Sequence, residues 1–320
     1  MAPSAQAHRR SHSLLLFQKL LNLRDSASPL TLVLDTLEQS ASPLIQEFIT
    51  RAKISHTKII FISFATIKQP SHADIFIQAR SKSLQKLRSE IVSHYPTPAA
   101  PTAKDSAASQ KILLILDTLN PLSTTSPRHL TPFLSSLLTH PTISLVATYH
   151  TDIPLSIPPS ALGEYEPHPL TVLNHLATAV LRVSSHYQTL ERRRAQNRSL
   201  PEPDFGLDEG REGVLVGLNA RTDGVVVEME LRRRSGRAVV ERFVLLSSSS
   251  SSSSSRQGTA AHLSLLSDHP LFAAPEESGG GEDEELADTT FSLGLTEKQR
   301  KDREGIVLPY FDAQEDVGGG

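Results

Sequence analysis

The sequence predicts an α/β protein whose sheet is mostly parallel and flanked by helices. Short runs of apolar, β-branched residues alternate with longer runs whose apolar residues recur at helical spacing, the pattern of strand–helix–strand crossovers. From residue 213 the pattern changes to β-rich runs joined by short glycine-containing turns, which is typical of antiparallel hairpins. A chain of 320 residues can form one large domain or two small ones.

The first three predicted strands are mostly apolar, as expected for strands buried on both faces. They cover residues 30–35, 58–64 and 111–117, and the third is the strongest strand pattern in the chain. The next two predicted strands cover residues 142–149 and 180–184. Strands that are consecutive in the sequence are separated by enough chain for a crossover helix, which favours parallel pairing.

Five helices are predicted from apolar spacing and start signals. The first 24 residues are basic, contain serine and lack acidic residues, a composition that resembles a mitochondrial transit peptide. We favour a core-facing helix there, because Leu14, Phe17, Leu20 and Leu21 fall at helical spacing. The other helices are indicated by Pro43 at a first helical position and by three apolar stretches, at residues 84–92, 128–138 and 170–179.

The end of the chain has a different composition. The β-rich runs cover residues 213–218, 225–231 and 238–245, and nine consecutive serines follow from Ser247. A low-complexity, increasingly acidic stretch buries too little surface to offset the entropy of ordering. We therefore expect three parts along the chain: a domain at 1–246 with a surface loop insertion at 96–108, a disordered linker at 247–287, and a tail at 288–320 that contains a docking motif at 291–314.

Composition and charge exclude several classes of protein. The absence of cysteine excludes disulfides, thiolate metal sites and a cysteine nucleophile. No apolar stretch approaches the roughly 18 residues that a membrane span needs, and the 13 histidines are scattered rather than spaced as metal ligands. The net charge of −3 divides into +6 before residue 271 and −9 from there on, a weak basic footprint for nucleic-acid binding.

Asp117 at the end of the third strand invites comparison with P-loop ATPases, in which such an acid helps to hold magnesium. That function also needs a glycine-rich loop with a lysine after the first strand. Residues 35–43 contain neither glycine nor lysine, and Asp35 and Glu38 would repel phosphate. We expect Asp117 to cap the next turn along the chain through its carboxylate. A degenerate magnesium-dependent ATPase with Asp117 as ligand is the alternative.

Two further groups of polar residues are candidates for a site. Residues 149–152 place a histidine and an aspartate near a strand end, where catalytic groups often gather, but no G-x-S-x-G nucleophile motif accompanies them. Arginines surround one hairpin turn and could contact phosphates, although solvated turn arginines are the commoner explanation. These four candidate tRNA contacts are Arg232, Arg233, Arg234 and Arg237.

The tail contains the most distinctive pattern of the chain. A charged helical turn that Thr296 can cap lies between two apolar clusters, an arrangement suited to a tethered segment that binds a groove. The predicted docking residues are Phe291, Leu293, Leu295, Ile306, Leu308, Tyr310 and Phe311. The tail could pack as a strap on its own domain or on a partner, and the sequence favours neither.

The tail run F-S-L-G-L-T-E-K-Q-R-K-D-R-E-G-I-V-L-P-Y-F-D-A-Q resembles the Elongator complex protein 5 family, the fifth subunit of the eukaryotic Elongator complex. The runs L-L-N-L-R-D, S-P-L-T-L-V-L-D-T-L-E-Q-S, K-I-L-L-I-L-D-T-L-N and E-M-E-L-R-R-R-S-G-R support the resemblance. It covers residues 13–246 and 291–314, and the serine run and the final glycines depart from it.

The resemblance implies a RecA-like fold without a functional P-loop, no cofactor, and a non-catalytic role. It further implies a hetero-hexameric ring with the fourth and sixth Elongator subunits, two copies of each. That ring joins the catalytic subcomplex and handles tRNA during modification of the wobble uridine at its 5-position. We expect a cytoplasmic and nuclear location without membrane association. A RecA-like DNA-repair relative is a further alternative, against which the tail motif argues.

Overall fold

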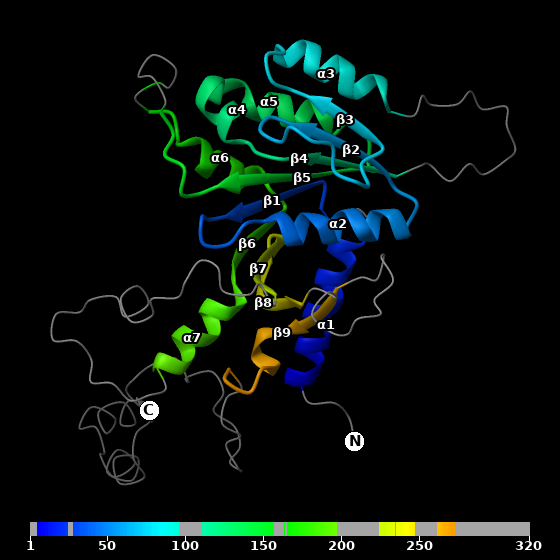
Figure 1. Ribbon diagram of the computed structural model, residues 1–320. Coiled ribbons are helices and arrows are strands. Elements are labelled where there is room, and N and C mark those ends of the chain that lie inside the picture. The colour runs from blue at the N-terminus through cyan, green and yellow to red at the C-terminus, as the bar shows by residue number, and fades with distance from the viewer. Residues whose placement is uncertain are drawn as a thin grey trace, which may run out of the picture. The chain divides into compact units, whose positions relative to one another are not determined.

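The computed structural model (Figure 1) describes eight stretches of the chain, which are residues 5–24, 28–95, 111–156, 163, 165–196, 224–233, 235–246 and 261–272. Several predictions lie outside these residues: the loop insertion at 96–108, the strand at 213–218, Arg234 and the whole tail. The chain divides into Met1–Ala273 and Ala274–Gly320. All described residues belong to the first unit, and none of their helices is long and apolar enough to cross a membrane.

The described strands form one nine-stranded sheet in the order β3-β2-β4-β5-β1-β6-β7-β8-β9. Their bounds are β1 Leu30–Asp35, β2 Lys58–Ser63, β3 Ile75–Gln78, β4 Ile112–Leu116, β5 Ile143–His150, β6 Ala179–Ser185, β7 Val225–Arg232, β8 Ala238–Leu246 and β9 His262–Leu265. Pairing is parallel from β3 to β6 and antiparallel from β6 to β9. The predicted class, a mostly parallel sheet flanked by helices and ending in antiparallel hairpins, is confirmed.

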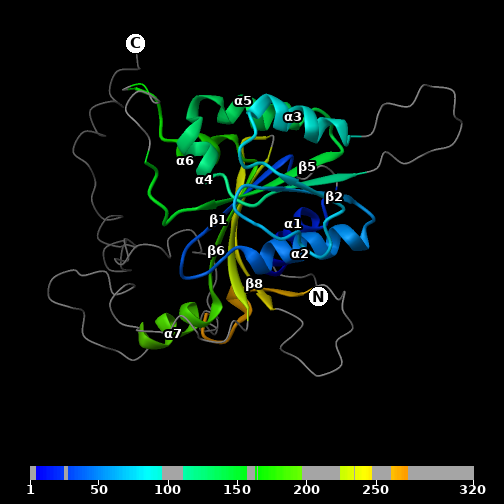
Figure 2. The same ribbon diagram turned by 45° about the horizontal axis from the view of Figure 1, so that its top comes forward.

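Helices cover both faces of the parallel part of the sheet (Figures 1 and 2). Their bounds are α1 Ala5–Leu21, α2 Ser42–Ile54, α3 Leu84–Ser93, α4 Asn120–Thr125, α5 Pro127–Leu137, α6 Pro169–Leu176 and α7 His186–Gln196. One apolar cluster joins α1 and α2 to one face, and a second joins α3, α4, α5 and α6 to the other. Each strand that packs against both clusters alternates its side chains between them, which explains why β1, β2 and β4 are mostly apolar.

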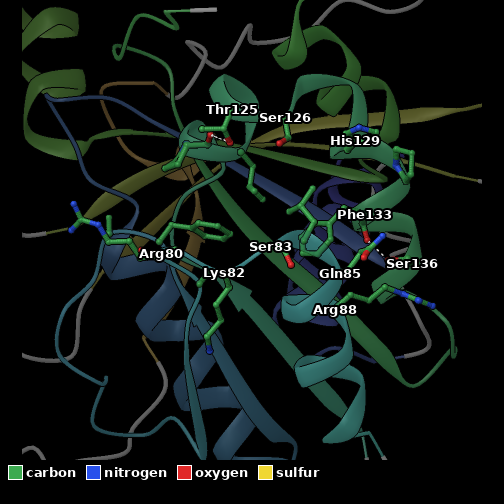
Figure 3. A pocket seen from close by; sticks show the side chains of 18 residues that line it. Arg80, Lys82, Ser83, Gln85, Arg88, Thr125, Ser126, His129, Phe133 and Ser136 are labelled. Atoms are coloured by element: carbon green, nitrogen blue, oxygen red, sulfur yellow. Dashed lines mark hydrogen bonds between the residues drawn. The ribbon is translucent and has the colours of Figure 1, made fainter. Parts of the chain in front are cut away.

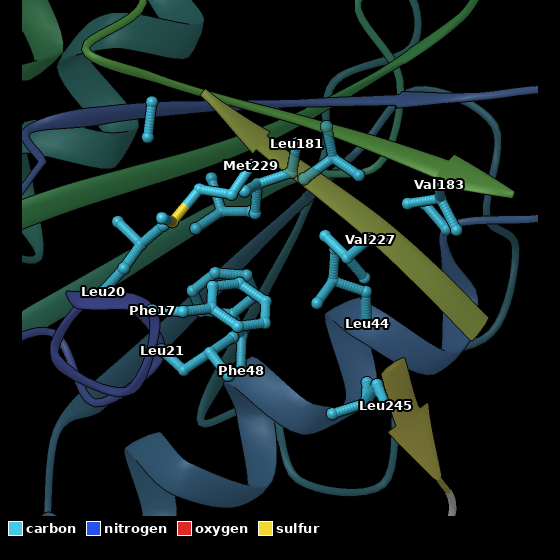
Figure 4. Packing of buried hydrophobic residues seen from close by; sticks show 14 of the residues in the cluster. Phe17, Leu20, Leu21, Leu44, Phe48, Leu181, Val183, Val227, Met229 and Leu245 are labelled. Carbon is cyan, nitrogen blue, oxygen red and sulfur yellow. The ribbon is translucent and has the colours of Figure 1, made fainter. Parts of the chain in front are cut away.

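The first cluster brings α1 against the antiparallel strands. Figure 4 shows Phe17 and Leu20 of α1 pointing toward Met229 of β7. The rings of Phe17 and Phe243 stack with centroids 4.5 Å apart, and Phe17 is fully buried. The helix interpretation of the first 24 residues is therefore confirmed over α1.

Sequence patterns missed two short elements. β3 has four residues at the sheet edge, and of these Ile77 alone is fully buried, so neither alternation nor a long apolar run marks it. α4 has six residues, Asn-Pro-Leu-Ser-Thr-Thr, which is too short for a helical period to show. The patterns along the chain predicted neither element.

The prediction of a disordered linker over 247–287 is wrong at residues 262–268, which form β9 and a short 3₁₀ helix, η2, at Leu266–Asp268. β9 pairs with β8, placing Leu265 opposite Phe243. The local sequence His-Leu-Ser-Leu-Leu alternates as a strand does, but the surrounding serine-rich and acidic composition obscures it. Pairing with an existing sheet edge supplies the hydrogen bonds that the isolated segment lacks.

Candidate functional site at the carboxyl edge of the sheet

The parallel strands β2, β4, β5 and β1 are adjacent and end at one edge of the sheet. In open α/β sheets this carboxyl edge is where ligands usually bind. The loop that leaves β1 and enters α2 corresponds in position to the phosphate-binding loop of P-loop proteins. The chemistry of that edge therefore decides what the fold can bind there.

Asp35 at the end of β1 is buried and satisfied by the chain itself. Its Oδ2 accepts a hydrogen bond of 2.9 Å from the Ala41 N–H, at the start of α2. Its Oδ1 lies 2.5 Å from Nδ1 of His150 at the end of β5. The carboxylate thus occupies the positive end of a helix dipole and joins two neighbouring strands.

A second carboxylate holds the middle of the β1–α2 loop. Leu37 N–H donates to Oδ2 of Asp152 at 2.6 Å. The Thr151 amide and hydroxyl both donate to the Asp35 carbonyl, at 3.0 and 2.9 Å. The loop is thereby tied to the segment after β5, and two amides that could face a ligand already donate to carboxylates.

Glu38 adds a third carboxylate to the same loop. Its Oε2 pairs with Arg192 of α7 at 3.1 Å, while its Oε1 is buried without a hydrogen-bond partner among the described atoms. Arg192 lies on α7, and its ion pair with Glu38 connects that helix to the edge of the sheet.

The carboxylate of Asp117 is also satisfied by neighbouring donors. Its two oxygens accept hydrogen bonds from the amides of Phe64, Ala65 and Thr66, at 2.8, 2.9 and 2.7 Å, and from the Ser63 hydroxyl at 3.1 Å. Asp117 caps the turn after β2, the neighbouring strand, rather than the turn that follows its own strand. The carboxylate therefore caps a turn, as predicted, but the predicted place, the next turn along the chain, is wrong.

The Asp35–His150 pair predicts a pH-dependent stability. The hydrogen bond from His150 Nδ1–H to Asp35 raises the pKa of His150 above its usual 6.5, although partial burial opposes the shift. The folded state then binds a proton more tightly than the unfolded state, so this stabilisation is complete below pH 6.5 and is lost as the pH rises through the raised pKa. In the parent protein the free energy of unfolding should therefore decline over this pH range. We expect the decline to be absent in the Asp35→Asn variant, as measured by urea unfolding at a series of pH values.

His140→Gln is the matched control for this experiment, because His140 bonds to a threonine hydroxyl and lies away from Asp35. The control should keep the slope of the parent protein. An Asp35→Asn slope equal to the parent's over roughly pH 6 to pH 9 would show that the pair does not titrate as described.

The hairpin turn predicted around the arginines is confirmed: it joins β7 to β8. Gly236 in this turn has φ +80°, a conformation that glycine adopts without strain. The described arginines of this turn, Arg232, Arg233 and Arg237, lie in different surroundings. Arg232 pairs with Glu230 at 2.9 Å and donates to the carbonyls of Asn174 and Ala177, capping the end of α6. Arg233 contacts His12 of α1 at 3.1 Å, and Arg237 is exposed.

Large apolar side chains are exposed at the carboxyl edge. Leu37 in the loop after β1 and Ile67 in the loop after β2 are each 83% exposed, and Ile153 after β5 is 45% exposed. The predicted docking residues of the tail lie outside the described part of the chain. Within that part, no three histidines or carboxylates are grouped so as to hold a metal ion.

Sequence reasoning identified Asp35, Glu38 and residues 149–152 separately but missed their connection. No local pattern indicates that Asp35 reaches His150 or that Asp152 reaches Leu37. A strand order that places β5 beside β1 would have predicted both, because register pairs Asp35 with His150.

Comparison with known proteins identifies the family. The family model for the Elongator subunit Iki1 matches residues 16–320. "Elongator complex protein 5" of Schizosaccharomyces pombe is 30% identical over 300 residues, which cover 92% of this chain and 87% of that protein. "Elongator complex protein 5" of Saccharomyces cerevisiae is 30% identical over 319 residues, which cover 97% and 92%.

Solved structures with similar folds are more distant. A DnaB-like replicative helicase has 8% identity and a TM-score of 0.38, over 68% of this chain and 56% of the helicase. The flagellar accessory protein FlaH from Methanocaldococcus jannaschii has 11% identity and a TM-score of 0.36, over 69% of this chain and 85% of FlaH.

The family model matches nearly the whole chain, and two relatives are 30% identical to it. The chain therefore belongs to the Elongator subunit Iki1 family.

Proposed function

We propose that this chain is a non-catalytic subunit that assembles through the carboxyl edge of its sheet. It would form a hetero-hexameric ring with the fourth and sixth Elongator subunits, two copies of each. The ring would join the catalytic subcomplex and bind tRNA during modification of the wobble uridine at its 5-position, in cytoplasm and nucleus. Its family supports membership of the complex, and the edge supports the non-catalytic role.

The observation that best supports this proposal is the occupation of the β1–α2 loop by carboxylates. Ala41 N–H donates to Asp35 and Leu37 N–H to Asp152. A triphosphate placed there would compete with these acceptors and meet like charges at close range, which costs several kcal/mol at about 4 Å. P-loop proteins use glycine amides and a lysine at this place, and residues 36–41 contain neither.

The same edge has the composition of an assembly surface. Leu37, Ile67 and Ile153 expose apolar area beside the carboxylate-filled loop. Burying one leucine or isoleucine side chain in an interface contributes about 1.5–3 kcal/mol before ordering costs. An edge that presents apolar side chains and no phosphate cradle suits contact with a neighbouring protein.

Leu37→Asp combined with Ile67→Asp is expected to prevent assembly. Two buried carboxylates without partners should weaken incorporation into a complex with the co-expressed fourth and sixth subunits by more than about 100-fold. Size-exclusion chromatography with light scattering measures the incorporated fraction. Circular dichroism of the variant should match the parent, because both side chains are exposed in the chain alone.

Ile54→Asp is the matched control for that experiment. Ile54 is also exposed, but it ends α2 and therefore lies at the opposite edge of the sheet, next to the start of β2. The control variant should assemble normally. Normal assembly of the Leu37→Asp/Ile67→Asp variant would contradict the proposed interface.

The hairpin arginines other than Arg232 remain candidates for contact with tRNA. Arg232 already donates hydrogen bonds to carbonyls at the end of α6. Replacing Arg233 and Arg237 by glutamate should weaken binding of tRNA to the assembled ring. It should also reduce the slope of log affinity against log salt by about 1 for each phosphate that the ring no longer neutralises. Fluorescence anisotropy over a salt series measures both quantities.

A variant with Lys68→Glu and Lys86→Glu changes net charge equally at exposed lysines far from the hairpin, and should keep the slope. An unchanged slope in the arginine variant would leave Arg233 and Arg237 as solvated turn residues. The tail residues Phe291 to Phe311 remain a proposed docking strap.

A further inference from the structure

A cavity of about 1150 Å³ opens among the segment after β3, the start of α3, and helices α4 and α5. Its apolar lining includes Phe64, Leu84, Leu122 and Phe133. Phe133 and Leu122 are held in the core beneath it. Figure 3 shows Ser83 and Phe133 in the middle of the view, with Arg80 and Arg88 on opposite sides.

The polar part of the lining is cationic. It contains Arg80, Lys82, Arg88 and His129, and no aspartate or glutamate lines the cavity among the described residues. This local excess is not a property of the whole chain, whose net charge is −3. The cavity therefore attracts anionic groups more strongly than its surroundings do.

Two of these cations are available for a ligand. Lys82 is paired with Glu90, at 2.9 and 2.6 Å from its two carboxylate oxygens. Arg80 and Arg88 are exposed, and neither makes a hydrogen bond or an ion pair with another described residue. The start of α3 adds to the positive potential on this side, because residues 83–85 line the cavity.

We propose that this cavity binds a short acidic peptide segment of another Elongator subunit, with an apolar side chain seated on the floor between α3 and α5. The apolar lining by Phe64, Leu84 and Phe133 favours a peptide over an RNA backbone. Polar phosphates and riboses gain no binding energy from apolar side chains, whereas an apolar side chain of a peptide does. The volume exceeds the roughly 300–1,000 Å³ of small-molecule pockets. Membership of a complex provides neighbouring chains, and the carboxylates of one of them would pair with Arg80 and Arg88. This proposal does not depend on the carboxyl-edge interface.

A photoreactive benzoylphenylalanine at position 85 tests the proposal in the assembled complex. Gln85 lines the cavity, whereas Ser89, one turn further along α3, is exposed but outside the lining and serves as the control position. After irradiation, we expect Gln85→benzoylphenylalanine to cross-link a peptide of another subunit that contains acidic residues next to an apolar one. The Ser89 control should not cross-link that peptide.

Charge reversal then links the cross-link to the proposed chemistry. Arg80→Glu combined with Arg88→Glu should reduce the cross-linking yield about tenfold. Lys86→Glu makes the same charge change at a residue of α3 outside the lining, and it should leave the yield unchanged. The proposal is overturned by a cross-link to tRNA, by one within this chain, by none at all, or by a yield that charge reversal does not lower. An intact complex with no cross-link at position 85 would still leave the carboxyl-edge proposal standing.

Discussion

Glu47→Ala is expected to lower the free energy of unfolding by about 3–5 kcal/mol. Glu47 and Arg51, one turn apart on α2, are only 5% and 9% exposed. Glu47 Oε1 lies 2.5 Å from Arg51 Nε, and the two carboxylate oxygens also accept from the Ala261 N–H at 3.2 and 3.1 Å. Removing the carboxylate leaves a buried guanidinium and a backbone amide without their acceptor.

The pair also connects distant parts of the chain. Arg51 donates to Asn22 Oδ1, just after α1, at 3.3 Å, and Ala261 directly precedes β9. The variant should therefore weaken the attachment of β9 to the domain as well as global stability. Urea unfolding measured by circular dichroism gives the global effect, and amide exchange of residues 262–265 gives the local one.

Two comparisons make this prediction specific. Glu90→Ala breaks the exposed pair with Lys82 and should cost less than about 1 kcal/mol. Glu47→Leu combined with Arg51→Leu removes both charges and should recover part of the loss, because no uncompensated charge stays buried. The single variants Glu47→Leu and Arg51→Leu complete the comparison. If the double variant loses as much unfolding free energy as the sum of the two single variants, Glu47 and Arg51 do not interact energetically.

Phe17→Ala is expected to lower the free energy of unfolding by about 3–5 kcal/mol. Phe17 is fully buried and stacks on Phe243 of β8 with ring planes 24° apart. Its removal would leave a cavity between α1 and the antiparallel strands, in the region shown in Figure 4. Thermal and urea unfolding of the purified chain measure the loss.

Leu15→Ala provides the control within the same helix, because Leu15 is exposed and should change stability by less than about 0.5 kcal/mol. Equal effects of the two substitutions would mean that α1 does not pack as described. A large difference would establish α1 as a structural element of the domain, in contrast to the transit-peptide interpretation that its composition also allows.

Patterns along the chain predicted the elements that are long and uniformly apolar. The predicted bounds of β1, β2 and β4 closely match the observed ones, because strands buried on both faces are apolar at most positions. The spacing of Leu84, Leu87 and Ile91 likewise predicted α3. β3, α4 and β9 were missed, since such short elements contain too few periods to form a pattern and depend on their neighbours for stability. α7 was also missed, because most of its residues are polar.

The candidate site was predicted only in part. The lack of glycine and lysine after β1 is a property of the sequence, and the structure places Asp35 at the end of β1 and Glu38 in the loop between β1 and α2. Which donors those carboxylates accept from was not predictable, because Asp35 contacts His150 and Glu38 contacts Arg192, partners that are distant in the sequence.

The sequence by itself therefore determined the fold class, the buried strands, the family and the lack of glycine and lysine in residues 35–43, because each depends on residue type and spacing along the chain. Only the tertiary structure decided that Asp152 holds the Leu37 amide, that Arg232 caps α6, and that Arg80 and Arg88 border an apolar cavity with no acidic lining among the described residues. The physical reason is that strand order and helix packing bring together side chains whose separation in sequence contains no record of their separation in space.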